Sequence, residues 1–404
     1  MRILVVGINY VPELTGIGKY SGEMAEWLVA AGHEVRVVTA PPYYPEWRVA
    51  EGYAAWRYTV EIRRRVKVWR CPLWVPARPS GLKRVLHLAS FALSSLPVLL
   101  RQVLWRPDVI LSIEPPLSCA PGALVCARLS GGKAWLHVQD FEVDAAFELG
   151  LLRARWLRRS LIGLESWLMR RFDRVSSISP NMLQRLLAKK VPAEQAVLFP
   201  NWVDTTAIFP LAGHGAMRQR LGIAPDAIVA LYSGNMGEKQ GLEFVLEAAR
   251  HLAGEADIRF VLCGDGAART RLQQRYAGLP NVLWLPLQPL RSLNDLLNMA
   301  NIHLLPQRSG AEDLVMPSKL TGMLASGRPV VAMANQGTQI AQVVQGCGIL
   351  VEPESIEPFA NAILHLARDA ATCASLGAHA RAYALEHLDR DRVMHEFEGQ
   401  LKKL

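Results

Sequence analysis

The sequence is poor in cysteine and lacks the common signatures of metal and nucleotide binding. Its six cysteines include no Cys-x-x-Cys pair, which argues against structural zinc sites and a disulfide framework. We expect buried free thiols in a reducing compartment. No G-x-S-x-G motif, P-loop or His/Asp/Glu cluster occurs, so we expect no metal cofactor. The triplet Asp389-Arg390-Asp391 lies in a predicted terminal helix, where we interpret it as helix surface or capping.

The sequence also lacks a hydrophobic run long enough to span a bilayer. The candidate, 85–100, has 16 residues and contains Pro97, against about 20 residues for a spanning helix. The chain begins with a strand pattern and shows no signal peptide, which predicts a cytoplasmic location. Basic residues flank the run, and Trp interleaves with Arg in 63–70 and 153–160. We expect residues 82–106 to lie as an interfacial helix on an anionic membrane, the inner face of the plasma membrane; the alternative is a domain helix with one buried face and a solvated basic rim.

Acidic residues are scarce in one half of the chain only. Residues 1–200 carry 27 Lys and Arg against 16 Asp and Glu, whereas residues 201–404 carry 18 against 20. A basic half is suited to nucleic acid, anionic lipid or acidic substrates. Because no nucleic-acid-binding module is visible, we expect no nucleic-acid partner.

Short apolar runs alternate with helical patterns along the chain, which is typical of an α/β protein with parallel sheets. A chain of 404 residues is expected to form two domains of roughly 150–200 residues. We predict that the second domain begins near residue 206, with 210–222 as the linker, and that 380–404 is one charged amphipathic helix. The predicted strands are Ile3–Val6, Val35–Thr39, Val109–Ile113, Ala134–Val138 and Val175–Ile178, followed by Val229–Tyr232, Phe260–Cys263, Val282–Leu285, Ile302–Leu305, Val330–Ala332 and Ile349–Val351.

Two candidate site segments lie in the first half. The first strand ends at Gly7, and eight residues separate it from Gly16-Ile17-Gly18, so the spacing is not that of a dinucleotide fingerprint. Such a loop before a helix can present amides to an anion or a sugar hydroxyl; alternatively, the glycines only turn the chain. In 136–144, acidic residues follow a strand end, where they can bind hydroxyls or act as a base, or serve only as a helix cap and surface acids.

The second half contains three loops that are typical of anion sites. Gly234 and Gly237 follow a strand and precede Lys239 and a helix, an arrangement suited to a diphosphate. "GDG" at 264–266 ends the next strand. In 304–330, a strand end is followed by a helix whose first turn should contain Ser318 and Lys319. A lysine there is unfavourable to the helix dipole, which indicates a bound anion.

The motifs taken together resemble the retaining glycosyltransferases of family 4, with the GT-B fold, over nearly the whole chain. They are the opening glycine loop, "PNWVD", "SGNMGEKQG", "GDG" and "PSKL". "GHEVRVVTAPPYYPEW" and "WRCPLWVP" are similar to the colanic-acid glycosyltransferases of exopolysaccharide biosynthesis. The resemblance implies two Rossmann-like domains facing a cleft: 1–205 on the acceptor side, joined by 380–404, and 206–379 on the donor side. It also implies a nucleoside-diphosphate sugar donor, with GDP-fucose suggested, and a lipid-linked saccharide acceptor.

The resemblance together with the loops predicts the site residues. The expected catalytic residues are His137, Asp140, Lys239 and Lys319. The expected donor-binding residues are Gly16, Gly18, Gly234, Asn235, Gly237, Gln240, Gly264, Gly266, Leu287, Arg308, Glu312, Asp313, Ser318 and Leu320, and the expected acceptor-binding residues are Tyr10, Tyr20 and Glu142.

The sequence departs from the family pattern at four of its usual positions. Asn235 stands where Arg is common, Gln240 where Lys is common, Gln139 where a histidine precedes the aspartate, and Gly322 where the second glutamate stands. Two alternatives therefore stay open: a nucleotide-sugar epimerase of the same fold, and a non-catalytic sugar-nucleotide-binding paralogue.

Overall fold

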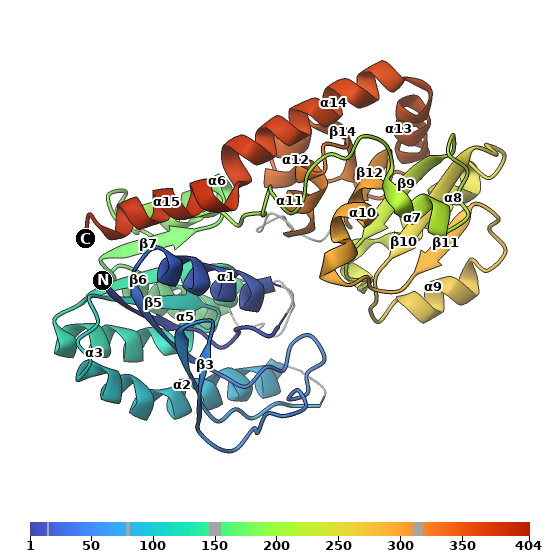
Figure 1. Cartoon of the computed structure of the whole chain (residues 1–404). Coiled ribbons are helices and arrows are strands. Elements are labelled where there is room, and N and C mark those ends of the chain that lie inside the picture. Colours follow the sequence, from blue (N-terminus) through green and yellow to red (C-terminus); the bar gives the residue numbers. More distant parts are fainter. Residues whose placement is uncertain (14–15, 78–80, 145–154, 310–317) are drawn as a thin grey trace. The chain divides into compact units, whose positions relative to one another are not determined.

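The computed structural model describes residues 1–13, 16–77, 81–144, 155–309 and 318–404. The chain forms two compact units, each with a sheet between helices (Figure 1). Unit 1 comprises Met1–Pro200 and Met394–Leu404, and unit 2 comprises Asn201–Val393.

Unit 1 is built on an eight-stranded sheet in the order β3-β4-β2-β1-β5-β6-β7-β8. All neighbours are parallel except β3 and β4. The order reverses at β1, whose neighbours are β2 and β5, so this is the sheet's topological switch point. The strands are β1 Arg2–Val6, β2 Glu34–Thr39, β3 Thr59–Arg63, β4 Val66–Arg70, β5 Val109–Glu114, β6 Lys133–Val138, β7 Arg174–Ser177 and β8 Ala196–Leu198.

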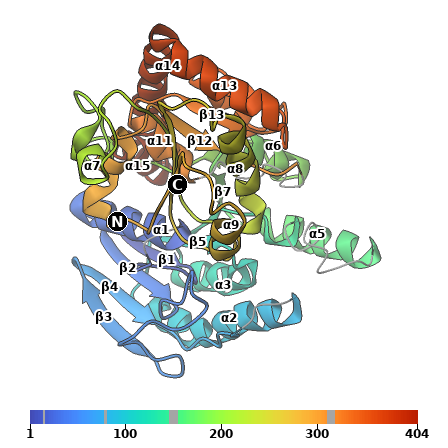
Figure 2. The same ribbon diagram turned by 90° about the vertical axis from the view of Figure 1, so that its right-hand side faces the viewer.

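Helices cover both faces of this sheet. Figures 1 and 2 show α2 and α3 side by side on the face opposite α1, and the Cys126 thiol of α3 donates to the carbonyl of Leu99 in α2 at 3.4 Å. Gly32, at φ 92°, follows the end of α1, where a glycine readily adopts the left-handed conformation that terminates a helix. The helices are α1 Gly16–Ala30, α2 Gly81–Val103, the 3-10 helix η1 Leu117–Cys119, α3 Ala120–Ser130, α5 Arg155–Met169 and α6 Pro180–Ala188.

The β3–β4 hairpin was missing from the predicted strands. Its two-residue turn is made by Arg64 and Arg65, both with positive φ, where Asn-Gly would be the usual signal. The hairpin also buries two residues of the Trp–Arg cluster in 63–70. Trp69 is only 9% exposed, and the guanidinium of Arg70 is buried against Glu61 and two backbone carbonyls, so neither side chain is available to a membrane.

Unit 2 is built on a six-stranded, wholly parallel sheet in the order β11-β10-β9-β12-β13-β14. Numbered within the unit, this is the order 3-2-1-4-5-6 of the dinucleotide-binding fold, with its switch point between β9 and β12. All six predicted strands are confirmed. They are β9 Ile228–Ser233, β10 Ile258–Cys263, β11 Val282–Leu285, β12 Ile302–Leu305, β13 Val330–Met333 and β14 Gly348–Val351.

The segment predicted as a linker, 210–222, instead folds as part of unit 2. It contains α7, in which the buried Arg218 donates to the carbonyls of Met299 and Ala227. Arg218 also donates to the side-chain oxygen of Asn301. These three hydrogen bonds hold the segment against the amino end of the unit 2 sheet. The helices of unit 2 are α7 Gly215–Arg220, η2 Glu238–Gln240, α8 Leu242–His251, α9 Arg269–Arg275, η3 Leu290–Ser292, α10 Leu293–Asn298, α11 Ser318–Ala325, α12 Gln339–Val344, α13 Ile356–Arg368 and α14 Ala370–Tyr383.

The prediction of a single helix over 380–404 is wrong. The helix α14 ends at Tyr383, a π-helical turn follows at Ala384–Leu388, and α15 runs over Arg390–Leu401. Asp389 interrupts the helix with extended backbone, and its carboxylate accepts from the amide of Arg392 and the hydroxyl of Thr205. The capping interpretation of the Asp-x-Asp triplet is therefore confirmed for Asp389.

The cysteines are free thiols, as predicted. Five are buried and Cys373 is partly buried. Burial raises the pKa of Cys71 to about 12, so this thiol stays protonated and unreactive at neutral pH.

Candidate functional site

Two glycine loops meet backbone to backbone at the carboxyl end of the sheet in unit 2. Gly234 follows β9, and Gly264 and Gly266 follow β10, all with positive φ. A Cβ on Gly264 would lie 1.9 Å from the carbonyl oxygen of Gly234, and one on Gly266 would lie 2.6 Å from the backbone of Met236. Only glycine permits this approach, which places both predicted loops at the switch point of the sheet.

Lys319 is held against the first of these loops. It lies in the first turn of α11, as predicted, and its side chain passes 3.4 Å from the position of a Cβ on Gly234. Among the described residues its Nζ has one hydrogen bond, to the hydroxyl of Tyr232 at 3.3 Å, and lies over that ring. Burial lowers the pKa of Lys319 to about 7. A desolvated ammonium with a neutral partner is prepared for an anionic ligand.

Other predicted donor residues border the same loops. Arg308, after β12, donates to the carbonyl of Glu238 at 2.9 Å and pairs with Glu243 in α8. The side-chain oxygen of Gln240 lies 2.9 Å from the position of a Cβ on Gly237. Asn235 and Ser318 are exposed.

The remaining predicted residues of unit 2 are two leucines and three residues that lie, wholly or in their side chains, outside the described part of the chain. Leu320 is fully buried, and Leu287 is 65% exposed. Glu312, Asp313 and the side chain of Lys239 lie outside the described residues. In the described ranges, no group of three or more His, Cys, Asp or Glu side chains is placed to hold a metal ion.

A hollow of 220 Å³ lies at the switch point of unit 1. Ile8 and Asn9 follow β1 and Pro115 follows β5, and all three line it. Three predicted residues are brought together here, Gly16, Gly18 and Asp140. Sequence reasoning missed the other polar and aromatic residues of the wall, which are Tyr43, Tyr44, Trp47, Arg84 and His87. The aromatic run "PPYYPEW" after β2 was the signal that could have indicated them.

A buried carboxylate holds the two sides of this hollow together. Glu13 is 4% exposed, and one of its oxygens accepts from the amides of Tyr43 and Tyr44, each at 3.0 Å. The other accepts from the side chain of Asn9 at 2.9 Å. A Cβ on Gly18 would lie 2.7 Å from this carboxylate, so the glycine lets α1 begin directly against it.

The structure buries three of the other predicted acceptor-side residues and leaves Glu142 partly exposed. His137 is 3% exposed and bonds Ser176 and Gln139, and burial lowers its pKa to about 3. Tyr10 and Tyr20 are 1% and 3% exposed. Glu142 accepts from the amide of Leu117 at 2.9 Å. Their assigned roles stay predictions.

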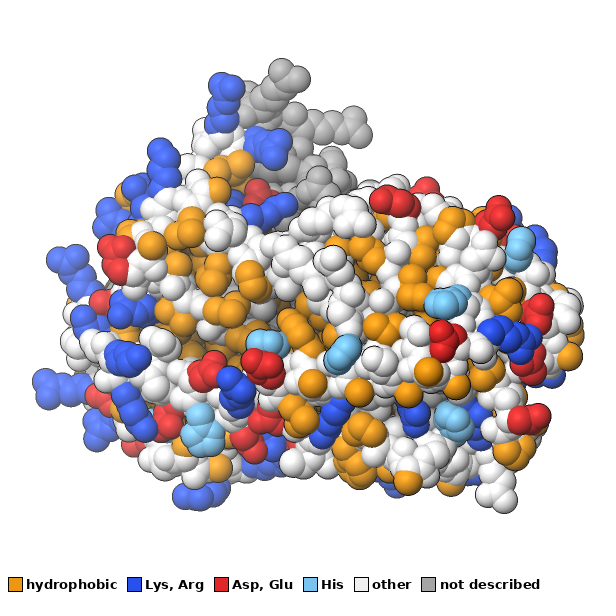
Figure 3. Space-filling model, turned by 90° about the horizontal axis from the view of Figure 1, so that it is seen from above, with side chains coloured by type: hydrophobic (Ala, Val, Ile, Leu, Met, Phe, Trp, Pro, Cys, Tyr) orange, Lys and Arg blue, Asp and Glu red, His pale blue; other side chains and the backbone are white. Residues whose placement is uncertain are grey.

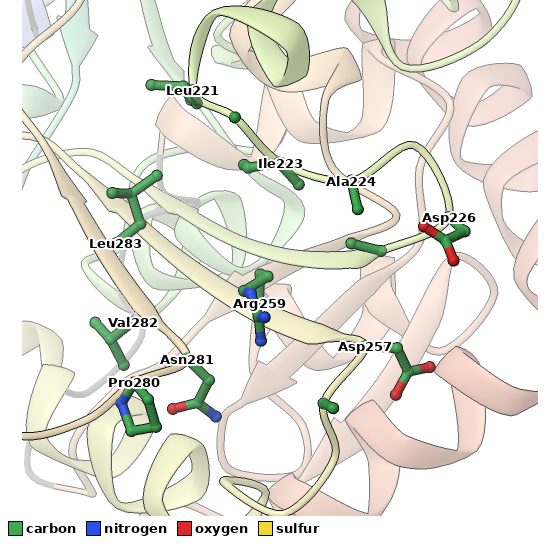
Figure 4. A pocket seen from close by; sticks show the side chains of 13 residues that line it. Leu221, Ile223, Ala224, Asp226, Asp257, Arg259, Pro280, Asn281, Val282 and Leu283 are labelled. Carbon is green, nitrogen blue, oxygen red and sulfur yellow. The ribbon is translucent and has the colours of Figure 1, made fainter.

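Another hollow, of 470 Å³, lies at the opposite, amino edge of the unit 2 sheet (Figure 4). It is lined by Arg259 together with Asp226 and Asp257. The carboxylate of Asp257 already pairs with Arg368 at 2.5 Å. None of the predicted site residues lies here, and the two carboxylates disfavour a diphosphate.

The helix α2 presents an apolar stripe to solvent. Leu82, Leu93 and Leu100 are 74%, 73% and 45% exposed, at spacings that place them on one helical face. Among the described residues, α2 is the one helix long and apolar enough to cross a membrane by length and composition, which is weak evidence by itself. On the face that Figure 3 draws, Lys and Arg side chains are most numerous in the left part, with Asp and Glu side chains among them.

The two units, each a mainly or wholly parallel sheet covered by helices, define the fold class of this protein, the GT-B fold. Over the whole chain the fold matches a sucrose-phosphate synthase from Thermosynechococcus elongatus, with a TM-score of 0.77, 18% identity and 98% of that chain covered. It also matches HepE from Anabaena, solved with UDP and glucose, with a TM-score of 0.71, 15% identity and 100% of that chain covered.

The sequence defines the family more narrowly. Residues 15–202 match the glycosyl transferase 4-like domain, and residues 227–369 match the glycosyl transferases group 1 domain. The chain is 45% identical to the provisionally named colanic acid biosynthesis glycosyl transferase WcaI of Escherichia coli (strain K12), over 100% of both chains. This chain therefore belongs to the family 4 glycosyltransferases, in the group of the colanic acid biosynthesis enzymes.

Proposed function

We propose that this glycosyltransferase moves a sugar, with retention, from a nucleoside-diphosphate donor to a lipid-linked saccharide at the surface of a membrane. The observation that carries the donor part is the position of Lys319 on the Gly234 loop. The donor base is open to test, since two relatives are GDP-mannose-dependent mannosyltransferases and HepE was solved with UDP. GDP-fucose is the donor that we favour.

The transfer step requires stabilisation of the leaving group. As the bond between the sugar and the β-phosphate breaks, its electron pair passes to the phosphate oxygen. The ammonium of Lys319 and the loop amides beside Gly234 would stabilise this charge, as donors held in place before the reaction do. The acceptor hydroxyl forms the new bond on the same face, and its proton passes to the departing phosphate. Because these groups supply the positive charge, we propose that transfer needs no metal ion.

The apolar stripe of α2 supports the membrane part of the proposal. Basic residues lie beside the stripe, with Lys83 and Arg84 in the first turns and Arg101 in the last turn. Exposed leucines between cations suit the headgroup region of an anionic leaflet. A lipid-linked acceptor would be presented at that surface.

Lys319→Met tests the donor assignment. We expect it to lower the rate of sugar transfer about a hundredfold, the usual effect of losing one such donor, with Lys403→Met as a control on an exposed lysine of unit 1. Wild-type transfer rates in Lys319→Met would refute the assignment.

A thermal-shift panel of UDP-, GDP- and dTDP-sugars tests the donor base. Sugars of one base should stabilise the wild-type protein. Transfer should also continue in the presence of EDTA, since we propose that no metal ion is needed.

A further inference from the structure

A buried tyrosine joins the Gly234 loop to Lys319. Tyr232 lies near the end of β9, and its side chain is fully buried. Its hydroxyl has two hydrogen-bond partners, the backbone carbonyl of Asn235 in the loop and the Nζ of Lys319, which lies 3.3 Å away. Burial of a phenol costs free energy unless its hydroxyl is hydrogen-bonded, and here both partners belong to the proposed donor site.

The chemistry of the two partners fixes the direction of both hydrogen bonds. A carbonyl oxygen only accepts, and a charged lysine only donates. The single proton of the Tyr232 hydroxyl therefore points to the carbonyl of Asn235, and a lone pair of the same oxygen accepts from Lys319. Burial raises the pKa of Tyr232 well above its usual value, so the hydroxyl keeps this proton at neutral pH.

The hydroxyl completes the fixation of one peptide unit of the loop. The carbonyl of the unit between Asn235 and Met236 accepts from Tyr232, and its N–H donates to the carbonyl of Asp265 at 2.8 Å. With both ends bonded, this unit cannot turn without losing a hydrogen bond. The amides of Asn235 and Gly237, on either side of it, have no hydrogen-bond partner among the described residues, so the fixed unit holds two amides in place for an anion.

The tyrosine also determines where the charge of Lys319 lies. The Nζ of Lys319 lies over the Tyr232 ring, 4.5 Å from its centroid, a position that a cation favours because the ring face is electronegative. The Cδ of the same lysine lies 3.4 Å from the position of a Cβ on Gly234. A lysine side chain has many rotamers when it is free, whereas this one contacts the loop along its stem and the tyrosine at its end.

We propose that Tyr232 is a positioning residue of the donor site, whose hydroxyl fixes the peptide unit of the loop and holds the ammonium of Lys319 where the charge of the leaving phosphate develops. The proposal rests on the proposed function and makes its donor site more specific. Tyr232 acts through Lys319 and the loop, since its buried hydroxyl is occupied by these two groups. Its hydrogen bond to the ammonium favours the charged lysine and partly offsets the effect of burial.

Tyr232→Phe removes the hydroxyl and keeps the ring, and it should lower the pKa of Lys319 by about one further pH unit, since a hydrogen bond to the charged form is lost. NMR titration of protein labelled at lysine Cε measures this pKa without any substrate, and the signal is assigned by its absence from Lys319→Met. Tyr276→Phe is the matched control, because that buried tyrosine of unit 2 also has a hydrogen bond, to Glu247 at 2.6 Å.

Nucleotide binding gives a second readout, which a merely structural role of the hydroxyl would not produce. The Kd of GDP and of UDP is measured by titration calorimetry between pH 5.5 and pH 8. If only the protonated lysine binds, the Kd of the preferred nucleotide in Tyr232→Phe should exceed the wild-type Kd about tenfold at pH 8 and less than twofold at pH 5.5. Tyr276→Phe should bind as wild type does at every pH.

The outcomes separate this proposal from the proposed function. An unchanged pKa of Lys319 in Tyr232→Phe, or a Kd raised equally at every pH, would overturn the positioning role. If Lys319→Met still loses nucleotide binding in that case, the donor assignment stands without Tyr232. If Lys319→Met binds nucleotides and transfers sugar as wild type does, the donor assignment itself fails, and the positioning role fails with it.

Discussion

At the scale of single residues, Lys319 and Glu13 illustrate opposite uses of a buried charge. Glu13 is satisfied by three hydrogen bonds within unit 1, so its charge organises structure. Lys319 has only the hydroxyl of Tyr232 among the described residues, so we propose that its charge is available to a ligand. The difference follows from the general rule that buried charges need partners, supplied by the fold or by the substrate.

The pKa of Lys319 predicts how donor binding depends on pH. In the proposed donor site a diphosphate would bind the protonated form of Lys319, and burial holds the pKa of this lysine at about 7 in the free protein. The Kd for GDP or UDP should therefore rise about tenfold per pH unit above pH 7, with proton uptake measurable by calorimetry in buffers of different ionisation enthalpy. In Lys319→Met the slope should vanish, and a pH-independent wild-type Kd between pH 7 and 9 would contradict the prediction.

The lowered pKa of Lys319 makes the fold more stable as pH rises, whereas it makes the predicted donor binding weaker. Because the folded pKa lies below the unfolded value of about 10.4, the unfolded state binds more protons between pH 7 and 10, and Lys319 destabilises the fold most below pH 7. The Tm of Lys319→Met should exceed that of wild type at pH 6.5, and the difference should shrink as pH rises toward 10. This result also shows that a loss of transfer in the variant is not a loss of fold.

At the scale of elements, α2 combines two surfaces that are usually separate. One face packs on α3 through the contact between Leu99 and Cys126, which explains why the helix belongs to a folded unit. The other face exposes Leu93 and Leu100. An interfacial helix needs this division, whereas a spanning helix would need apolar side chains all round.

Flotation with vesicles tests the role of α2. The double variant Leu93→Glu/Leu100→Glu should reduce binding to vesicles that contain anionic lipid by about tenfold or more, since each buried leucine contributes about 1.5–3 kcal/mol and the added charges are repelled. Leu290→Glu, at a leucine of unit 2 that is 66% exposed, is the matched control. Equal flotation of wild type and the double variant would rule out α2 as the docking surface.

At the scale of the whole molecule, the chain returns to the unit in which it began. The last residues, Met394–Leu404, belong to unit 1. There Phe397 stacks on Phe199 with ring centroids 4.0 Å apart and meets Trp135 edge-on at 5.1 Å. His33 bonds Glu398 at 2.9 Å. The C-terminal helix α15 is therefore part of the hydrophobic core of the N-terminal unit.

Phe397→Ala should destabilise unit 1 selectively. Truncation of a buried phenylalanine, here 2% exposed, costs about 3–5 kcal/mol through lost burial and the cavity that remains. Calorimetry should show the transition of one unit lowered in temperature while the other keeps its wild-type value. Phe209→Ala, at a residue of unit 2 that is 40% exposed, is the control, and a uniform shift of both transitions would contradict the assignment.

The elements were readable from the sequence where local signals agree. Short apolar runs predicted the strands of unit 2, and the glycines that follow two of them predicted the loops at Gly234 and Gly264, because apolar patterning and glycine's freedom at positive φ are properties of short segments. The β3–β4 hairpin and the break at Asp389 could not be read, since Arg64 and Arg65 are unusual turn residues and an aspartate inside a charged stretch does not by itself end a helix. The resemblance to family 4 then predicted how these separate strands and loops are arranged over the whole chain.

The composition of the pocket in unit 1 follows from folding. Ile8, Tyr44, Arg84 and Asp140 come from four segments far apart in the sequence, and they meet because parallel strands bring their carboxyl ends to one edge at a switch point. The sequence likewise indicated His137 through its place near Asp140, and no motif indicated His87; both are buried, but only His87 of the two is among the residues that line the pocket. The sequence by itself determines charge, motif spacing and hydrophobic periodicity. The burial of a side chain and its contacts with residues distant in sequence are decided only when the sheets form.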